Sequence, residues 1–180
     1  MQELWVFGYG SLMWNPGFPF AEKTPARIHG WHRELCIYSW VHRGTPEKPG
    51  LVLGLDRGGS CRGMAYLVRP DDVQETIAYL RKREQVTSVY REITTRIHLL
   101  DGSDRNVSAL TYVADRTQPQ YAGHLPLDQL EHFVRQGVGG SGANPDYVIA
   151  TVDHMIESGI PDVRLYELAR RLKNTPKSQA

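Results

Sequence analysis

An apolar strand that breaks into a glycine-containing turn constrains this sequence more than any other feature. The stretch from Trp5 to Phe7 is typical of a buried strand, and a turn with Gly8 and Gly10 follows at once. Glycines occur where the backbone takes a positive φ or where a ligand comes close. We expect the turn to leave the N–H groups of Gly10, Ser11 and Leu12 without strand partners, and such successive N–H groups bind an anion or a developing oxyanion. A plain tight turn is the alternative interpretation.

Composition restricts the classes of protein to which the chain can belong. Its 180 residues fit a single domain, over residues 1–180, with a full hydrophobic core. A formal net charge of +1 gives no electrostatic reason to expect nucleic acid or an anionic membrane as a partner, and no apolar run approaches the length of a membrane-spanning helix. The two cysteines, Cys36 and Cys61, make no disulfide framework, and the acidic start of the chain is unlike a signal peptide. We therefore expect a cytoplasmic protein.

Hydrophobic periodicity predicts a mixture of strands and helices. The expected strands cover residues 26–41, 51–56, 62–68, 90–100 and 106–113, with turns at Gly58-Gly59 and Asp101-Gly102. One helix begins at Pro70 with an acidic N-cap, and Asn144-Pro145 caps a later one. The later helices cover residues 126–136, 144–159 and 161–173, before a frayed tail from Asn174. This pattern indicates an α+β fold with a small mixed or antiparallel, barrel-like sheet and packed helices.

Glu84 is the strongest candidate for a catalytic residue. It follows Val73, Ile77 and Leu80 at steps of four, three and four, so it lies on the apolar face of its helix, at the negative end of the helix dipole. Desolvation and the dipole both disfavour the charged form, so we expect the pKa of Glu84 to rise toward neutrality, as a general base requires. The alternative is a solvated carboxylate paired with a nearby arginine, of which the candidates are Arg81, Arg83 and Arg91.

Two further loops carry candidate substrate contacts. Arg43 lies in a loop that is made stiff by glycine and proline, so its guanidinium is suited to bidentate contact with a carboxylate; a solvated loop arginine is the alternative. Residues 137–142 match G-x-G-x-x-G, but they follow a helix and not a strand, so they do not predict a dinucleotide site. They open the helix at Asn144, whose N-terminus could receive a carboxylate, and a structural helix end is the alternative.

The sequence shows no metal site and no cysteine or serine with the surroundings of a nucleophile. Its seven histidines lack metal-ligand spacing, and neither H-E-x-x-H nor a Cys/His cluster occurs. Cys36 and Cys61 lie inside strand patterns and are expected to be small core residues. Ser11 lacks the G-x-S-x-G surroundings of a nucleophilic serine, so we interpret it as a group that forms hydrogen bonds with a substrate.

Three of these segments resemble the ChaC family of glutathione-specific γ-glutamylcyclotransferases. Residues 5–14 are similar to the family's γ-glutamyl-binding loop, residues 80–84 to its L-x-x-R-E segment, and residues 141–147 to its G-x-N-x-x-Y region. The resemblance implies a γ-glutamylcyclotransferase-like fold, Glu84 as the catalytic acid and base, and no cofactor. The substrate-binding residues that it implies are Gly8, Tyr9, Gly10, Ser11, Leu12, Met13, Arg43, Asn144 and Tyr147.

The activity that the resemblance implies is cleavage of glutathione into 5-oxoproline and cysteinylglycine. Two alternatives stay open. One is the same chemistry on other γ-glutamyl amines or dipeptides, since the sequence does not indicate which leaving group the protein accepts. The other is a non-catalytic binding or regulatory protein linked to cation transport, against which a destabilised acid at Glu84 argues. The sequence also leaves open the oligomeric state and whether residues 137–142 touch the substrate.

Overall fold

The computed structural model describes residues 2–86 and 88–174. The chain divides into two compact units, of which the first includes the residues up to Glu34 and Leu53–Tyr121, and the second Leu35–Val52 and the chain from Ala122 on. Strands β2 (Glu22–Ser39) and β3 (Gly50–Val68) contribute residues to both units. The expectation of one domain over residues 1–180 stays a prediction, and the predicted frayed tail beyond residue 174 lies outside the described residues.

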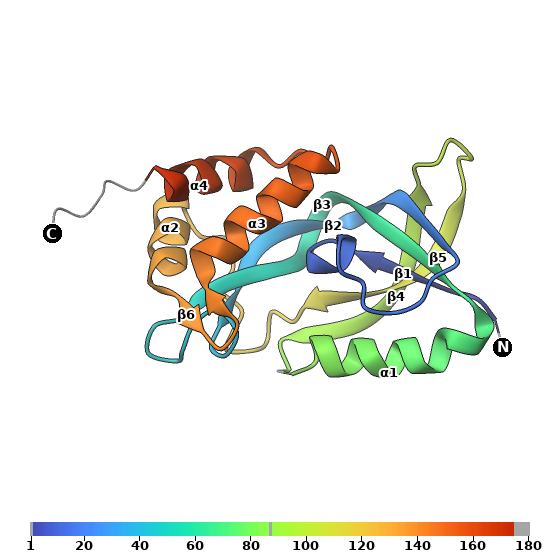
Figure 1. Ribbon diagram of the computed structural model, residues 1–180, viewed down its shortest axis with the longest axis horizontal. Coiled ribbons are helices and arrows are strands. Elements are labelled where there is room, and N and C mark those ends of the chain that lie inside the picture. Colours follow the sequence, from blue (N-terminus) through green and yellow to red (C-terminus); the bar gives the residue numbers. More distant parts are fainter. Residues whose placement is uncertain (1, 87, 175–180) are drawn as a thin grey trace, which may run out of the picture. The chain divides into compact units, whose positions relative to one another are not determined.

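The first unit is built on a closed barrel with the strand order β1-β3-β2-β4-β5. Its other strands are β1 (Leu4–Gly8), β4 (Tyr90–Leu99) and β5 (Asn106–Ala114). β1 pairs antiparallel with β3 and parallel with β5, whereas β4 is antiparallel to β2 and to β5 (Figure 1). The predicted α+β fold with a small, mixed, barrel-like sheet is therefore confirmed.

Helix α1 (Val73–Glu84) packs on these strands through an apolar cluster (Figure 1). The buried members of the cluster are Val6, Leu12, Phe18, Tyr66, Val68, Leu80, Leu110 and Tyr112. Burial of a large apolar side chain contributes about 1.5–3 kcal/mol, so the cluster fixes the helix on the sheet. A 3₁₀ turn after β1, Ser11–Met13, supplies Leu12 to the same cluster. The turn and the helix are thus held by one core.

Strand β3 differs from the prediction. The sequence predicts two strands, over residues 51–56 and 62–68, with a turn at Gly58-Gly59, and this is wrong: the structure has one continuous strand. Gly58 and Gly59 lie inside it, with φ of +101° and +68°. Glycine takes these left-handed values without a steric cost, so the strand continues through both residues.

The second unit contains three helices, α2 (Leu127–Gln136), α3 (Asn144–Glu157) and α4 (Val163–Lys173). A short hairpin of β6 (Val138–Gly139) and β7 (Gly142–Ala143) separates α2 from α3 in the sequence. The apolar side chains that the helices bury are Leu130, Val134, Val148, Val152, Met155, Leu165, Leu168 and Leu172. The three predicted helices are confirmed, because each of their ends lies within two residues of its expected position.

Two helix starts differ from the predicted caps. Asp72 precedes α1, but its side chain makes no capping hydrogen bond, and Pro70–Asp72 forms a 3₁₀ turn instead. Asn144 is the first residue of α3 and its side chain does not cap the helix. Helix α4, by contrast, begins with a side-chain cap, because Asp162 Oδ1 accepts a hydrogen bond from Leu165 N at 3.0 Å.

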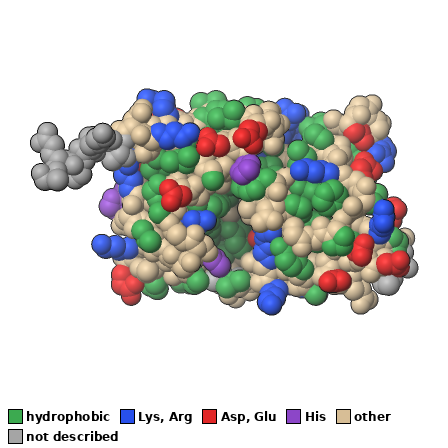
Figure 2. Space-filling model, in the orientation of Figure 1, with side chains coloured by type: hydrophobic (Ala, Val, Ile, Leu, Met, Phe, Trp, Pro, Cys, Tyr) green, Lys and Arg blue, Asp and Glu red, His purple; other side chains and the backbone are tan. Residues whose placement is uncertain are grey.

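The surface carries mixed charge. Lysine and arginine side chains alternate with aspartate and glutamate over the face shown in Figure 2. This alternation gives that face no extended field of one sign to attract a polyanion. No helix formed by residues 2–86 or 88–174 is long and apolar enough to span a membrane.

Candidate active site

The turn after β1 has free backbone donors. Hydrogen bonds from Met13 N to Gly10 O (2.9 Å) and from Trp14 N to Ser11 O (3.3 Å) close the 3₁₀ turn. The N–H groups of Gly10, Ser11 and Leu12 come before these bonds, and they donate to no residue in the described part of the chain. The first N–H groups of a helical turn carry partial positive charge. The predicted set of free donors is therefore confirmed.

Side chains from two strands donate hydrogen bonds to the carbonyl groups of this turn. The hydroxyl of Tyr66, in β3, donates to Leu12 O and Met13 O, each at 2.8 Å. Arg33, in β2, is 9% exposed and donates from Nε to Tyr9 O at 2.7 Å. Burial raises the pKa of Tyr66 to about 12, so its hydroxyl stays protonated and remains a donor. The carbonyl side of the turn is thus held by the protein, whereas the N–H groups of Gly10, Ser11 and Leu12 have no partner among the described residues.

The two glycines of the turn serve different purposes. A Cβ on Gly8 would lie 2.8 Å from Leu12 Cβ, which is too close for a real contact. A Cβ on Gly10 would make an ordinary contact of 3.7 Å with Leu53 Cδ1. Neither glycine takes a positive φ, so of the two reasons expected for them, close approach applies and left-handed geometry does not. Gly8 lets the chain fold back on itself, and Gly10 keeps space open beside the free donors.

Glu84 ends α1 with a carboxylate that is largely withdrawn from water. Its side chain is 18% exposed, and Leu80, one turn earlier, is fully buried. Burial raises the pKa of Glu84 above its ordinary value, and the charge of Arg83 partly opposes this shift. The predicted direction of the pKa shift is confirmed, and its main cause is desolvation. When ionised, such a carboxylate accepts a proton more readily than a solvated one.

Arg83 connects Glu84 to the turn after β1. Its Nε lies 3.3 Å from Glu84 Oε1, and its Nη2 donates to Ser11 Oγ at 2.8 Å. Its Nη1 donates to Asn15 O at 2.8 Å and to Tyr79 OH at 3.0 Å. Because the guanidinium is planar and rigid, these contacts fix the carboxylate and the serine hydroxyl relative to each other.

The other two arginines named as partners for Glu84 have different surroundings. Arg91 lines a cavity that is described below. Arg81 makes a bidentate pair with Glu92, in which Nε donates to Oε2 at 2.9 Å and Nη2 donates to Oε1 at 2.8 Å. The Tyr112 hydroxyl donates to the same Oε2 at 2.9 Å. Hydrogen bonds from Arg81 hold the pKa of Glu92 below its usual range, so Glu92 stays ionised. This network ties the last turn of α1, which carries Glu84, to β4 and β5.

Arg43 and Tyr147 lie together in the second unit. The Arg43 guanidinium is 5.4 Å from the centre of the Tyr147 ring, and its Nη1 donates to Ala143 O at 3.2 Å. Its backbone N–H donates to Ser39 Oγ at 2.9 Å. The ring and the carbonyl hold the guanidinium in place, as expected for an arginine on a stiff loop. Their contact with a substrate stays a prediction.

Asn144 has a structural role. It is fully buried, its Nδ2 donates to Leu51 O at 2.8 Å, and its Oδ1 accepts from Leu51 N at 2.7 Å. The side chain thus satisfies the backbone of β3 as a neighbouring strand would. Since the residue has no exposed surface here, this geometry does not support the substrate contact expected for Asn144.

The glycine-rich segment at residues 137–142 packs closely on the Arg43 loop. Gly140 N donates to Val41 O at 2.8 Å, and Ser141 N donates to His42 O at 2.9 Å. A Cβ on Gly137 would lie 2.4 Å from Arg43 O. The glycines are therefore explained by close approach to a neighbouring backbone, which favours the structural interpretation of this segment.

Candidate metal ligands and nucleophiles do not gather in the described structure. Among residues 2–86 and 88–174, no group of three or more His, Cys, Asp or Glu side chains is placed to hold a metal ion. Cys36 and Cys61 are buried in the core, as predicted. Ser11 Oγ accepts from Arg83 and has no histidine beside it among its hydrogen-bond partners, so its geometry is that of a hydrogen-bonding group.

Sequence reasoning missed two residues that shape this site. Arg33 carries no recognisable signal, because it lies within a strand and its partner Tyr9 is 24 positions away in the chain. From the sequence, Arg83 is predicted only as one of three arginines that could pair with Glu84. Its spacing of four residues from Tyr79 places both side chains on one helix face, and this could have indicated its direction.

Comparison with known proteins gives consistent results. A family model described as ChaC-like protein matches residues 4–175. The chain is 32% identical over 170 residues to the glutathione-specific gamma-glutamylcyclotransferase of Escherichia coli (strain K12), covering 94% of this chain and 73% of that protein. It is 35% identical over 156 residues to glutathione-specific gamma-glutamylcyclotransferase 1 of Mus musculus, covering 86% and 70%. A crystal structure of the glutathione-specific enzyme from yeast matches with a TM-score of 0.86 and 22% identity over 96% of both chains, which shows the fold.

Proposed function

The chain belongs to the ChaC family, and on this premise we propose that it is an enzyme that cleaves glutathione by intramolecular cyclisation, giving 5-oxoproline and cysteinylglycine. The observation that carries the proposal is the pairing of a buried carboxylate with free backbone donors. Glu84 and the N–H groups of Gly10, Ser11 and Leu12 belong to the same compact unit, and Arg83 bridges Glu84 to Ser11. A base and an oxyanion site held in fixed geometry are what this reaction needs.

The turn after β1 would bind the γ-glutamyl group. Its free N–H groups suit a carboxylate or the oxygen of the γ-carbonyl, on which negative charge develops. The Ser11 hydroxyl is held by Arg83 Nη2 and keeps its own hydrogen to donate to the substrate. Gly10 allows the substrate to approach the backbone closely, because nothing projects from it.

Glu84 would act first as a base and then as an acid. Its carboxylate takes a proton from the substrate's α-ammonium group, and the amine so formed attacks its own γ-carbonyl carbon to make a five-membered ring. The tetrahedral intermediate places its negative charge on the oxygen at the backbone donors. It then collapses with cleavage of the amide C–N bond, and Glu84 returns the proton to the departing cysteinylglycine amine. The ring nitrogen loses its second proton as the intermediate collapses, and the cysteinylglycine amine takes it up and leaves as an ammonium group. Two protons thus pass from the α-nitrogen to the leaving nitrogen and no electrons are transferred, so the net reaction is balanced without a cofactor.

Orientation supplies a large part of the rate in such a cyclisation. The attacking amine and the carbonyl belong to one molecule, so the protein needs only to hold the chain in its cyclising conformation. The contacts of Tyr66 and Arg33 with the turn, and of Arg83 with both Ser11 and Glu84, provide that rigidity. We also propose that the enzyme acts in the cytoplasm, where its two buried thiols, Cys36 and Cys61, would stay reduced.

Release of 5-oxoproline from glutathione tests this function directly. The wild-type protein should produce 5-oxoproline and cysteinylglycine in equal amounts. Turnover of other γ-glutamyl dipeptides in preference to glutathione would support the broader γ-glutamyl specificity instead. Binding of glutathione without any product would support a regulatory protein and would contradict the proposal.

The two loop glycines should respond differently to alanine. Gly8→Ala should lower the free energy of unfolding by about 1–3 kcal/mol, because the added methyl group must displace Leu12 and the turn. Gly10→Ala should melt close to the wild type, since its Cβ has room, yet lower kcat/KM by roughly tenfold or more, because the methyl group would occupy space needed by substrate. Thermal melts beside glutathione kinetics check both. A Gly10→Ala enzyme with wild-type kcat/KM would move the substrate away from this turn.

Activity should depend on pH through Glu84. Since the carboxylate must be ionised to accept a proton and burial raises its pKa, the acid limb of kcat/KM should have its midpoint above the ordinary glutamate value of about 4.3. The raised pKa also means that ionisation of Glu84 destabilises the folded protein relative to an unfolded chain. The free energy of unfolding of the wild type, relative to Glu84→Gln, should therefore fall as the pH rises through the pKa of Glu84. An acid limb at or below about 4.3 would show an ordinary solvated carboxylate.

A further inference from the structure

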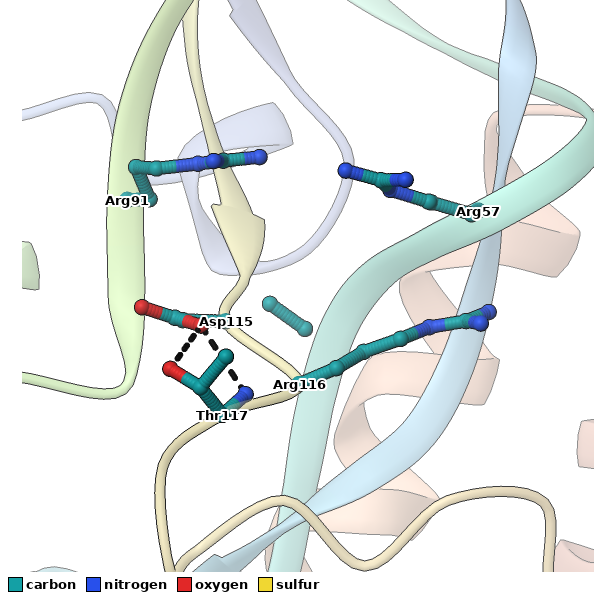
Figure 3. A pocket seen from close by; sticks show the side chains of 6 residues that line it. Arg57, Arg91, Asp115, Arg116 and Thr117 are labelled. Carbon is teal, nitrogen blue, oxygen red and sulfur yellow. Dashed lines mark hydrogen bonds between the residues drawn. The ribbon is translucent and has the colours of Figure 1, made fainter.

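A cavity of the first unit has three arginines among its six lining residues. Its volume is about 260 Å³. The lining residues are Arg57, Arg91, Ala114, Asp115, Arg116 and Thr117. Figure 3 shows Arg57 extending from β3 and Arg91 from β4 toward each other across it. The mechanism described above uses none of these side chains.

Two of the three arginines have unused donors. Arg116 is engaged, because its Nε donates to Asp56 Oδ1 at 2.8 Å and its guanidinium lies 5.7 Å from the centre of the Tyr121 ring. The side chains of Arg57 and Arg91 donate no hydrogen bond to any residue in the described part of the chain. Two guanidinium groups that face each other, with unused donors, are arranged to bind one anionic group between them.

The carboxylate of Asp115, which lines the cavity, already accepts hydrogen bonds from Thr117. Asp115 Oδ1 accepts from Thr117 Oγ1 at 2.7 Å and from Thr117 N at 3.0 Å. These hydrogen bonds hold the pKa of Asp115 below its usual range, so it stays ionised. Even so, the arginines outnumber the two carboxylates near them, Asp115 and Asp56, and the cavity keeps a positive charge. Its ligand should therefore be a small anion.

Contacts through Leu53 and Tyr90 connect the turn after β1 with the strands that border the cavity. The Cβ position of Gly10 is 3.7 Å from Leu53 Cδ1, and Leu53 O accepts from the Tyr90 hydroxyl at 2.6 Å. Tyr90 stands opposite Ala114 in the β4–β5 ladder, and Ala114 lines the cavity. In Figure 3 the segment that follows β1 passes behind the gap between Arg57 and Arg91.

We propose that Arg57 and Arg91 bind the glycine carboxylate of glutathione and so select the leaving group. This rests on the proposed function, which places the γ-glutamyl group at the turn after β1. The two residues of cysteinylglycine reach about 7 Å beyond the γ-carbonyl when extended, which suits a carboxylate site near the turn and not at it. A γ-glutamyl amine without this carboxylate would leave the hydrogen-bond donors of both guanidinium groups unused, and the enzyme would bind it less well.

The test compares glutathione with its glycine amide, in which the terminal carboxylate is replaced by an uncharged group of the same size. The wild type should prefer glutathione in kcat/KM by roughly tenfold, which is the effect of one solvent-screened, charge-assisted contact. Arg57→Gln and Arg91→Gln should each reduce the ratio of the two kcat/KM values toward one, mainly by raising KM for glutathione. Both variants should leave kcat/KM for the amide unchanged.

Arg96→Gln is the matched control. Arg96 is an exposed arginine of the same strand as Arg91, opposite Ser108 and outside the cavity, so its removal changes the net charge equally and should leave the preference intact. Raised ionic strength should lower the preference of the wild type and of Arg96→Gln but not that of the cavity variants. A wild type that does not distinguish the two substrates, or cavity variants that keep the full preference, would overturn the proposal.

The experiment distinguishes an error in the proposed carboxylate site from an error in the proposed function. If the wild type releases no 5-oxoproline from either compound, the proposed function is wrong. The dissociation constants of glutathione and its amide, measured by calorimetry on the same proteins, then decide the binding site alone. A preference for the acid that is lost in Arg57→Gln and Arg91→Gln would still support the site, and equal affinities would reject it.

Discussion

Glu84→Gln is expected to abolish measurable release of 5-oxoproline from glutathione while the protein stays folded. The amide has the shape of the carboxylate but cannot accept a proton from the substrate's α-ammonium group or return one to the leaving amine. Loss of a general acid–base group lowers rates by about 10²–10⁴-fold, and here one residue performs both transfers. Because the wild-type carboxylate is disfavoured by burial, Glu84→Gln should unfold within about 1 kcal/mol of the wild type.

Two further variants show whether the carboxylate itself is responsible. Glu75→Gln removes an exposed carboxylate from the same helix and should leave kcat/KM unchanged. Glu84→Asp keeps the charge but withdraws it by one methylene, so it should retain part of the activity and an acid limb in its pH profile. A Glu84→Gln protein that turns over glutathione at the wild-type rate would exclude Glu84 as the base.

Arg83→Gln should have the next largest effect on activity. It should change both kcat/KM and the pH at which activity is lost on acidification. It removes the hydrogen bonds to Ser11 Oγ and Asn15 O, so the turn is no longer fixed to α1, and a displacement of about 1 Å can lower kcat/KM by roughly 10²-fold. It also removes the positive charge 3.3 Å from Glu84 Oε1, which holds the pKa of Glu84 down. The midpoint of the acid limb should therefore move to higher pH than in the wild type.

The comparison with Arg83→Lys separates these properties. Lysine keeps the charge but cannot form the planar set of contacts, so Arg83→Lys should lose much of the activity and leave the acid limb near its wild-type position. Lys82→Gln removes a neighbouring exposed charge and should change neither property. An Arg83→Gln enzyme whose acid limb stays in place would mean that Arg83 acts only on the turn.

Local patterns in the sequence predicted most of the secondary structure and the apolar surroundings of Glu84. The steps of Val73, Ile77, Leu80 and Glu84 placed a carboxylate on an apolar helix face, and the structure gives it an 18% exposed side chain with a raised pKa. The glycine turn likewise predicted unpaired N–H groups. Both inferences succeed because they depend on hydrogen bonds and side-chain directions within a few residues, which are set by helix and turn geometry alone.

Strand continuity and helix capping required more than local patterns. Gly58-Gly59 has the composition of a turn, yet the neighbours of β3 continue to pair with it, so it remains one strand. Asn144 has the composition of a helix cap, yet Leu51, 93 positions earlier, offers both a donor and an acceptor to its amide. In both cases hydrogen bonds to distant backbone outweigh a local preference of about 1 kcal/mol.

The sequence by itself determined the fold class, the positions of the three C-terminal helices, the free donors of the turn and the apolar setting of Glu84. Only the tertiary structure decided which charge stands beside that carboxylate. Arg81, Arg83 and Arg91 are equivalent candidates in the sequence, but the fold pairs Arg81 with Glu92, places Arg83 between Glu84 and Ser11, and points Arg91 into the cavity with Arg57. A long side chain reaches partners from any element that packing brings near, and that packing is a property of the whole chain.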